Sequence, residues 1–383
     1  MRIAKKPWGL LAAPLLAAAL LFWAAGLAGA EDGRLGSDLP SDPEALYMKA
    51  CAACHGPGGT GADPEEFGFD VLPPDFTECN FASREPTQDW YFVVAEGGPA
   101  RGFSEFMPAF GDAMTIEQVD KTLRHVHSLC GDDDWPRGEL NLPRPLVTTK
   151  AYPEDELVVE LEVDDKKRQS TRLKAIYEKR IGPRFQLEAA VPYEWREQDD
   201  QDWESGVGDA TLGAKLVAYS SLEYGSIVSP GLEVVIPTGE EKNGLGGGVT
   251  KLEPYLAWGQ IWPLWDVFTH AQVGYAHVMG NPSDRDVNDE WFWRTAVGRT
   301  FTFGRFGRTV TPMVEFVGQE EIGRNTPTEW DVVPQVQIPL NRRQHVRLGL
   351  GVRYPLNNYQ TRDHRYMAYL LWDWFDGGFF EGW

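Results

Sequence analysis

Two cysteines and a histidine near the start of the chain have the spacing of a covalent haem site. They are Cys51, Cys54 and His55, which together read Cys-x-x-Cys-His. In this pattern the two thiols add to the vinyl groups of a c-type haem, and the histidine lies under the iron. A surface Cys-x-x-Cys, or half of a zinc site, is the alternative interpretation. We predict one covalent haem c, because the chain has only four cysteines and no second Cys-x-x-Cys.

The first thirty residues have the pattern of a secretory signal peptide. Basic residues precede an apolar run that ends at Ala28-Gly29-Ala30, and such a small-residue ending is typical of a cleavage site. An uncleaved anchor helix is the alternative, which Pro14 inside the run disfavours. Export places the haem site in an envelope compartment and permits a disulfide. Cys79 and Cys130 are the two cysteines left to form it.

The region from residue 31 to residue 140 is strongly acidic. It carries 22 acidic and 7 basic side chains, in a chain whose formal net charge is -21. Such a field repels nucleic acid and attracts basic proteins or metal cations. Plain solubility is an equally good reason for the acidity. We therefore exclude nucleic acid as a partner and expect a soluble electron carrier instead.

Two helices and an intervening loop are expected around the haem motif. The run Ser41-Asp42-Pro43-Glu44 predicts a helix that leads into the cysteines. A second helix is predicted from Thr115-Ile116-Glu117-Gln118, which has the spacing of a capping box. Between them a Gly/Pro-rich stretch contains Met107. A haem pocket needs a loop at this position.

This arrangement, from about residue 40 to residue 131, resembles a class I monohaem cytochrome c. The resemblance implies thioether links at Cys51 and Cys54, with His55 as the proximal ligand and Met107 as the distal ligand. A His/Met pair raises the reduction potential relative to two histidines. Because both axial positions are filled, the resemblance favours an electron carrier over an enzyme that turns over its own substrate.

Four other side chains compete with Met107 for the distal position. Met48 is predicted within the first helix, and Met114 lies beside the cap of the second. His125 and His127 lie on that second helix, where a histidine is more often a surface or packing residue. We favour Met107 because a flexible loop can direct sulfur to the iron more readily than a packed helix.

The chain from about residue 150 onwards alternates apolar and polar residues with a period of two. Leu187, Val191 and Tyr193, for example, alternate with Glu188 and Glu194. About twelve such segments are present, joined alternately by short turns and long polar loops, with aromatic residues near their ends. These features predict an antiparallel transmembrane β-barrel of about 12 strands. A soluble β-sandwich or closed barrel with an apolar core is the alternative.

Two resemblances refine the interpretation of this second region. The runs 207–215 and 235–239 resemble the outer-membrane transporter family associated with phenol-degradation operons. The overall plan is similar to the fused cytochrome-porins of iron-oxidising bacteria. The chain departs from that plan in having a complete class I cytochrome and a smaller barrel, so the identity of the electron donor does not carry over.

The sequence therefore predicts a multi-domain protein. We expect a signal peptide at 1–30, an all-α cytochrome c domain at 31–131, a linker at 132–153 and an outer-membrane β-barrel at 154–383. With an even number of strands, the chain enters and leaves the barrel on the same, periplasmic side. We therefore expect the cytochrome domain at the periplasmic mouth. A whole cytochrome should not fit within so small a barrel.

Two functions from different classes are compatible with this plan. The first is electron transfer at the outer membrane, with a periplasmic electron carrier as partner and an extracellular donor as one source of electrons. The second is solute transport by a porin, with the cytochrome as a redox-active plug or dock. In the second case inward-facing charges would set the selectivity; they include Arg172, Lys174, Arg347, Arg353 and Arg365. A third reading is that the barrel merely anchors the cytochrome.

Overall fold

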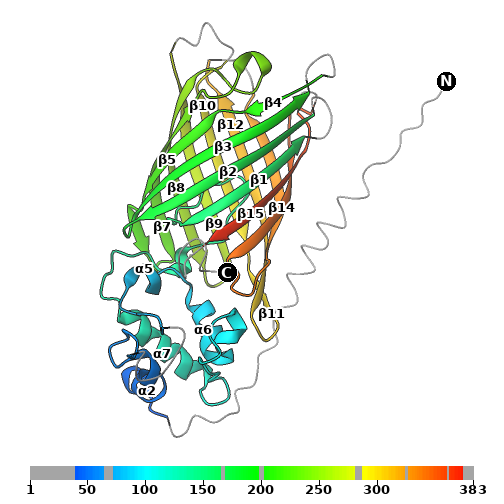
Figure 1. Ribbon diagram of the computed structural model, residues 1–383. Coiled ribbons are helices and arrows are strands. Elements are labelled where there is room, and N and C mark those ends of the chain that lie inside the picture. The colour runs from blue at the N-terminus through cyan, green and yellow to red at the C-terminus, as the bar shows by residue number, and fades with distance from the viewer. Residues whose placement is uncertain are drawn as a thin grey trace, which may run out of the picture.

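The chain folds into a small helical region and a β-barrel that meet end to end (Figure 1). The computed structural model describes residues 39–63, 72–164, 169–197, 202–280, 287–323, 327–359 and 362–373. The predicted signal peptide lies outside the described residues, and so do the last ten residues with their five aromatic side chains.

The α-helices of the described residues all precede the barrel. They are α2 (Pro43–Ala50), α3 (Ala52–His55), α5 (Cys79–Ala82), α6 (Thr87–Glu96) and α7 (Ile116–Ser128). The 3-10 helices η1 (Gly98–Arg101) and η2 (Gly138–Leu140) belong to the same part of the chain, and a third, η3 (Glu241–Asn243), lies in the connection between two barrel strands. None of the helices described is long and apolar enough to cross a membrane.

Local capping explains where the two main helices begin. The side chain of Asp42 accepts a hydrogen bond from Ala45 N–H at 2.9 Å, which caps α2. At α7, Gln118 N–H donates to Thr115 Oγ1 at 3.2 Å, and Thr115 N–H donates to Gln118 Oε1 at 2.9 Å. The predicted capping box is therefore confirmed, and both helix starts follow from residues within one turn of them.

The core of the helical region forms where α2 packs against α7. Leu46 and Tyr47 on α2 are fully buried, as are Val119 and Leu123 on α7. A disulfide between Cys79 and Cys130 joins the start of α5 to the end of α7, with 5.1 Å between the two Cα atoms. The disulfide links residues that lie 51 positions apart in the sequence.

Twelve antiparallel strands close into a barrel. In their order around the barrel they are β1 (Glu156–Asp164), β2 (Ser170–Ile181), β3 (Phe185–Glu197), β5 (Ala210–Leu216), β7 (Ser226–Ile236), β8 (Thr250–Trp262), β9 (Val267–Met279), β10 (Glu290–Gly298), β12 (Arg308–Glu321), β13 (Glu329–Pro339), β14 (Val346–Pro355) and β15 (Arg365–Asp373). Pairing of β10 with β12 and of β1 with β15 closes the ring. This confirms the predicted architecture.

Three short strands extend this ring. β4 (Trp203–Val207) pairs with β3, β6 (Tyr219–Ser221) pairs with β7, and β11 (Phe301–Phe303) pairs with β12. β4 lies in a polar stretch between two long strands, where the sequence predicts a long loop and no strand.

The outer surface of the barrel is apolar, and polar side chains face its interior. On β3, Leu187 and Val191 are 44% and 49% exposed, whereas Gln186 and Glu194, on the opposite face of the strand, are buried. This is the reverse of a soluble barrel, and it is the pattern of a barrel whose outer surface faces lipid. The soluble alternative is therefore disfavoured by the direction in which the two faces point.

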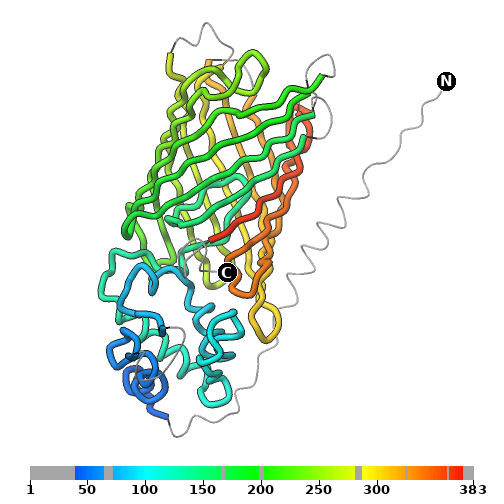
Figure 2. Tube along the Cα trace, in the orientation of Figure 1, coloured from blue at the N-terminus to red at the C-terminus, as the bar shows by residue number. Residues whose placement is uncertain are grey.

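The helical region packs against the barrel mouth that carries the short turns (Figures 1 and 2). The first residue of β1 and the last residue of β15, Glu156 and Asp373, pair with each other at this mouth. The chain therefore enters and leaves the barrel on the side of the helices. This arrangement matches the expected placement of the helical region outside the barrel.

Candidate functional site

The predicted haem motif lies at the junction of α2 and α3. Cys51 ends α2, and Cys54 and His55 lie on the single turn of α3. Gly56 ends this turn with a left-handed φ of +74°, where a Cβ would lie 2.8 Å from the carbonyl oxygen of Gly61. Tyr47 O–H donates to Gly56 O at 2.6 Å, so α2 holds the end of the motif in place.

His55 is packed against an aromatic ring and kept neutral. Its ring stacks on Phe76, with 4.7 Å between the centroids. Burial lowers the pKa of His55 to about 4, so the imidazole is neutral at physiological pH, which is the form that binds iron. Burial and, to a lesser extent, the nearby Cys54 raise the pKa of Cys51 to about 11, so Cys51 stays a thiol.

Two buried polar atoms in this region have no hydrogen-bond partner among the described residues. They are His55 Nδ1 and Trp90 Nε1, and Trp90 packs 5.6 Å from Phe76 between ring centroids. Buried polar groups are normally satisfied, so these two, together with the unbonded thiols of Cys51 and Cys54, fit a prosthetic group at this position. When bound, a c-type haem supplies reversible one-electron redox chemistry.

Met107 lies on the loop between η1 and α7 and is half-buried. The loop is tied to its surroundings by its backbone, since Gly98 N–H donates to Met107 O at 3.0 Å. Among the described contacts none joins the Met107 sulfur to the His55 side of the site. The distal ligand therefore stays a prediction.

The structure places the four competing ligands in other environments. Met114 belongs to the buried core beneath α2 and α7, and Met48 is 47% exposed. Both ring nitrogens of His127 have partners: Nδ1 lies 3.2 Å from Ala82 O, and Nε2 lies 3.3 Å from a threonine hydroxyl. His125 packs against the ring of Tyr47. Among the described contacts, none marks one of these four side chains as the iron ligand.

A segment inside the barrel is the feature that sequence reasoning missed. Residues 140–155, most of them in the predicted linker, fold into the lumen, and we call this segment the plug. Leu146, Val147 and Thr148 all donate their backbone N–H to the carboxylate of Glu315 on β12, at distances from 2.7 to 3.3 Å. Glu315 is fully buried, so the plug is bound rather than loosely threaded.

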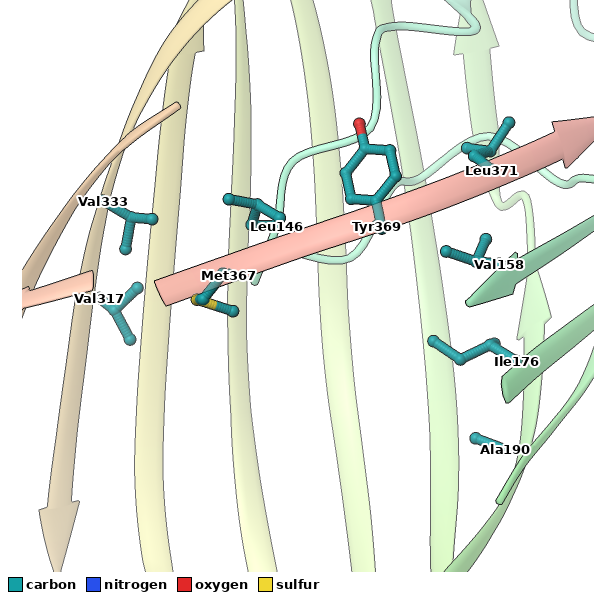
Figure 3. Packing of buried hydrophobic residues seen from close by; sticks show 9 residues of the cluster. All are labelled: Leu146, Val158, Ile176, Ala190, Val317, Val333, Met367, Tyr369 and Leu371. Atoms are coloured by element: carbon teal, nitrogen blue, oxygen red, sulfur yellow. The ribbon is translucent and has the colours of Figure 1, made fainter. Parts of the chain in front are cut away.

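Apolar packing and further hydrogen bonds hold the plug on other sides. Figure 3 shows Leu146 of the plug among apolar side chains of the surrounding strands, including Tyr369 and Met367. Tyr369 O–H donates to Arg144 O at 2.8 Å, and Lys215 Nζ donates to Tyr152 O at 2.9 Å. The leucines of the supposed linker were the available signal, since a solvated linker has no need of them.

Charged pairs join the helical region to the barrel mouth. Glu85 lies 2.7 Å from the Nε2 atom of His345 in the β13–β14 turn. Burial alone would raise the pKa of Glu85, but the charge and hydrogen bond of His345, together with Arg347, hold that pKa below its ordinary value. Arg84 pairs with Asp155 at the end of the plug. The helical region is therefore docked by specific contacts.

The positive side chains predicted to line the lumen are all paired with carboxylates. Their partners are Glu194 for Arg172, Glu160 for Lys174, Asp373 for Arg347, Asp331 for Arg353, and Glu162 with Asp164 for Arg365. Glu188, Glu233 and Glu253 have no ion pair with another described residue, and Glu233 and Glu253 oppose each other on β7 and β8. Lys215 and Arg294 likewise form no ion pair with another described residue and bond to neutral oxygen acceptors, so unpaired groups of both signs face the lumen.

Comparison with protein families supports the two-part reading. Residues 38–126 match the family model described as "Cytochrome C oxidase, cbb3-type, subunit III". Residues 169–359 match the model described as "Putative MetA-pathway of phenol degradation". The helical region is thus a cytochrome c-type domain, and the barrel carries a phenol-degradation-associated family region. No curated protein matches the chain.

Solved outer-membrane proteins resemble the barrel distantly. An outer membrane channel from Pseudomonas putida F1 is 13% identical, over 61% of this chain and all of its own length, with a TM-score of 0.44. The KdgM porin is 11% identical, over 57% of this chain and 99% of its own, with a TM-score of 0.38. The barrel architecture is established by the strand pairing of this chain itself.

Proposed function

We propose that this protein is an electron carrier anchored in the outer membrane, which exchanges electrons with a soluble carrier in the periplasm. The observation that supports this most directly is the docking of a cytochrome c-type domain, through buried charged pairs, on the short-turn mouth of a lipid-facing barrel. Short turns face the periplasm in outer-membrane barrels. In this proposal Cys51 and Cys54 hold the haem covalently, and His55 and Met107 bind its iron.

The position of the haem motif favours exchange away from the barrel. α2, which ends at Cys51, lies at the end of the helical region farthest from the barrel (Figure 1). The strands are up to 14 residues long, which at about 3.3 Å per residue spans some 45 Å along a strand. The haem therefore does not reach the far side of the barrel directly.

The plug restricts the route by which an extracellular electron donor could reach the haem. Because residues 140–155 fill the lumen beside the haem domain, a large donor has no route through this end of the barrel. An extracellular donor would need a small diffusible mediator or a second redox protein. We therefore propose that the direct partner is periplasmic, and that it is a basic protein attracted by the acidic helical region.

Reduction of the haem in intact cells tests this proposal. A membrane-impermeant reductant is added to intact cells and, in parallel, to cells with a permeabilised outer membrane, and the reduced haem spectrum is recorded. We expect reduction only after permeabilisation. Fast reduction in intact cells would show an outward electron path and overturn the periplasmic assignment. Absence of a haem spectrum in the purified protein would overturn the electron-transfer proposal as a whole.

Solute transport through the barrel is a second candidate, supported by the polar and charged side chains that face the lumen. Charged groups of both signs, such as Glu233 and Arg294, would contact a solute in a wet lumen. The plug argues against transport, because the segment occupies the lumen and is bound on several sides. Conductance of the purified chain in planar bilayers separates the two candidates: a closed barrel supports the anchored electron carrier, and a steady ion current supports transport.

A further inference from the structure

The loop that carries Met107 is held by the elements that precede it. Gly98 N–H, at the start of η1, donates to Met107 O at 3.0 Å, and Phe110 N–H donates to Val94 O on α6 at 2.9 Å. A Cβ at Gly98 would lie 3.1 Å from Met107 Cβ and 2.2 Å from Ser104 O. The loop thus lies directly against η1, and a shift of η1 moves the Met107 backbone.

The barrel in turn holds η1 through one arginine. Arg101, the last residue of η1, is only 2% exposed. Its guanidinium donates to the carbonyl oxygens of Phe306 and Gly307 in the turn between β11 and β12. It also pairs with Asp89 on α6 at 2.7 Å and lies 5.0 Å above the ring of Phe92. The buried guanidinium group of Arg101 therefore joins α6, η1 and a barrel turn.

A second barrel turn contacts the next residues of the loop. Arg343, in the turn between β13 and β14, lies 4.6 Å from the ring centroid of Phe103 and donates to Gly102 O at 3.4 Å. The neighbouring Gln344 donates to Gly307 O at 3.2 Å, which links the two turns. Two turns of the barrel therefore contact the end of η1 and the first residues of the loop that leads to Met107.

From these contacts we propose that the barrel positions the distal haem ligand. The β11–β12 turn fixes η1 through Arg101, and η1 fixes the backbone of Met107. The inference rests on the proposed function, because it takes Met107 as the iron ligand. Arg101 is a positioning residue in this scheme: it acts on the strength of the iron–sulfur bond through the loop and does not touch the haem itself.

A substitution on the barrel side gives the sharpest test. Gly307 has a φ of +58°, and a Cβ there would lie 2.2 Å from the ring of Phe92. Gly304 in the same turn has a φ of +69° and nothing within 4 Å. Gly307→Ala and Gly304→Ala therefore carry similar backbone strain, but only the first presses on the helical region. Both are measured in the full chain, purified in detergent.

The readouts are the far-red charge-transfer band of ferric haem, which reports sulfur bound to iron, and the reduction potential. We expect Gly307→Ala to lower the ratio of sulfur-bound to sulfur-free haem about tenfold and to lower the potential, because a weaker thioether bond favours the ferrous form less. Gly304→Ala should leave both unchanged.

Substitution of Arg101 provides the second, independent arm. Arg101→Met removes every donor and should weaken the far-red band as Gly307→Ala does. Arg101→Lys keeps the charge beside Asp89 but loses the fork, so it should rescue the band in part. Arg124→Ala is the control, because Arg124 is an exposed α7 residue whose pair with Asp120 lies on the helix surface.

The outcomes separate this inference from the proposed function. An unchanged band and potential in Gly307→Ala and in both Arg101 variants would overturn the positioning role, while haem-based electron transfer would stand. A wild-type protein that carries haem but lacks the band would show that Met107 is not the ligand and would overturn this inference. If Gly307→Ala does not accumulate as a haem-loaded protein, the two Arg101 variants decide: a weaker band in Arg101→Met that Arg101→Lys restores in part supports the positioning role, and an unchanged band in Arg101→Met overturns it.

Discussion

The helical region and the barrel differ in how many polar and charged side chains they bury. The core of the helical region gathers apolar side chains such as Leu46, Tyr47 and Leu123, whereas the barrel interior combines apolar clusters with polar and charged groups such as Gln186 and Glu315. The outer face of the barrel is apolar, as expected of a surface in lipid, whereas the helical region buries its apolar side chains away from water. The outward-facing side chains therefore indicate which solvent each region meets.

The two interiors also differ in what fills them. Around the haem motif, His55 Nδ1 and Trp90 Nε1 are buried without a described partner, as expected where a prosthetic group contributes to the core. In the barrel the chain supplies its own filling, and Glu315 satisfies three successive backbone N–H groups of the plug. The first interior fits a prosthetic group, and the second is filled by a segment of its own chain.

Removal of both attachment thiols should give the largest effect. In the double variant Cys51→Ser and Cys54→Ser neither thioether bond can form, so no haem should remain with the chain after denaturation. A haem-stained denaturing gel measures this. The matched control is Cys79→Ser with Cys130→Ser, which should keep the stain. Haem that stays bound to the first variant in the denaturing gel would place the attachment elsewhere.

Removal of the plug's main acceptor should open the barrel. In Glu315→Ala the backbone N–H groups of the plug lose a buried charged acceptor, and each such bond contributes about 1.5–3 kcal/mol. Conductance in planar bilayers should therefore rise above that of the wild type. Glu188→Ala is the control, because Glu188 makes no hydrogen bond or ion pair with the described residues of the plug. Equal conductance in all three proteins would show that Glu315 does not hold the plug.

Loss of the disulfide should destabilise only the helical region. By the chain-entropy relation, a bridge across 51 residues contributes about 4 kcal/mol. Reduction of the Cys79–Cys130 bridge should therefore lower the denaturant midpoint for loss of the haem-region signal. The barrel transition, followed by mobility on an unheated gel, should stay in place. A matching loss in both transitions would mean that the two regions unfold as one unit.

An added arginine should destabilise the barrel much more at one of two adjacent β3 positions than at the other. Leu187→Arg puts a cation on the outer face, at a cost of about 2–4 kcal/mol if the position lies near the middle of the bilayer. Glu188→Arg puts the same side chain in the lumen, where we expect a much smaller cost. Denaturant unfolding from lipid vesicles compares them. Similar costs would contradict the assignment of the two faces.

Acid should weaken the helical region through a buried histidine. Burial and, to a lesser extent, the charge of Arg137 lower the pKa of His127 to about 4 from its ordinary value of 6.5. Between these values the unfolded chain binds the extra proton, so stability is complete above pH 6.5 and falls as the pH drops. Near about pH 5 the loss should be about 2 kcal/mol. His127→Gln should lack this pH dependence, and the measurement is denaturant unfolding across the same range.

Features that depend on neighbours in the sequence could be predicted from the sequence. The spacing of Cys51, Cys54 and His55, the capping box at Thr115 and the period-two alternation of the strands all operate within a few residues. These local patterns were sufficient for the helix starts, the position of the haem motif and the number of strands. The assignment of Met107 rests on a resemblance, and no contact in the structure tests it.

Features that join distant parts of the chain needed the tertiary structure. The predicted linker proved to lie largely inside the barrel. There, for example, the backbone N–H of Leu146 donates to the carboxylate of Glu315, which lies 169 positions away in the sequence. Likewise Arg101 bonds to Phe306, which lies 205 positions away.

The sequence by itself determined that this chain carries a haem motif on helices and twelve alternating strands, since spacing and periodicity are properties of short stretches. Only the tertiary structure decided that a segment fills the barrel and that barrel turns clasp the loop of Met107. Contacts of this kind form only when the sheet closes and brings its surfaces together. The residues that meet then are far apart in the sequence, so no short stretch of sequence indicates the contact.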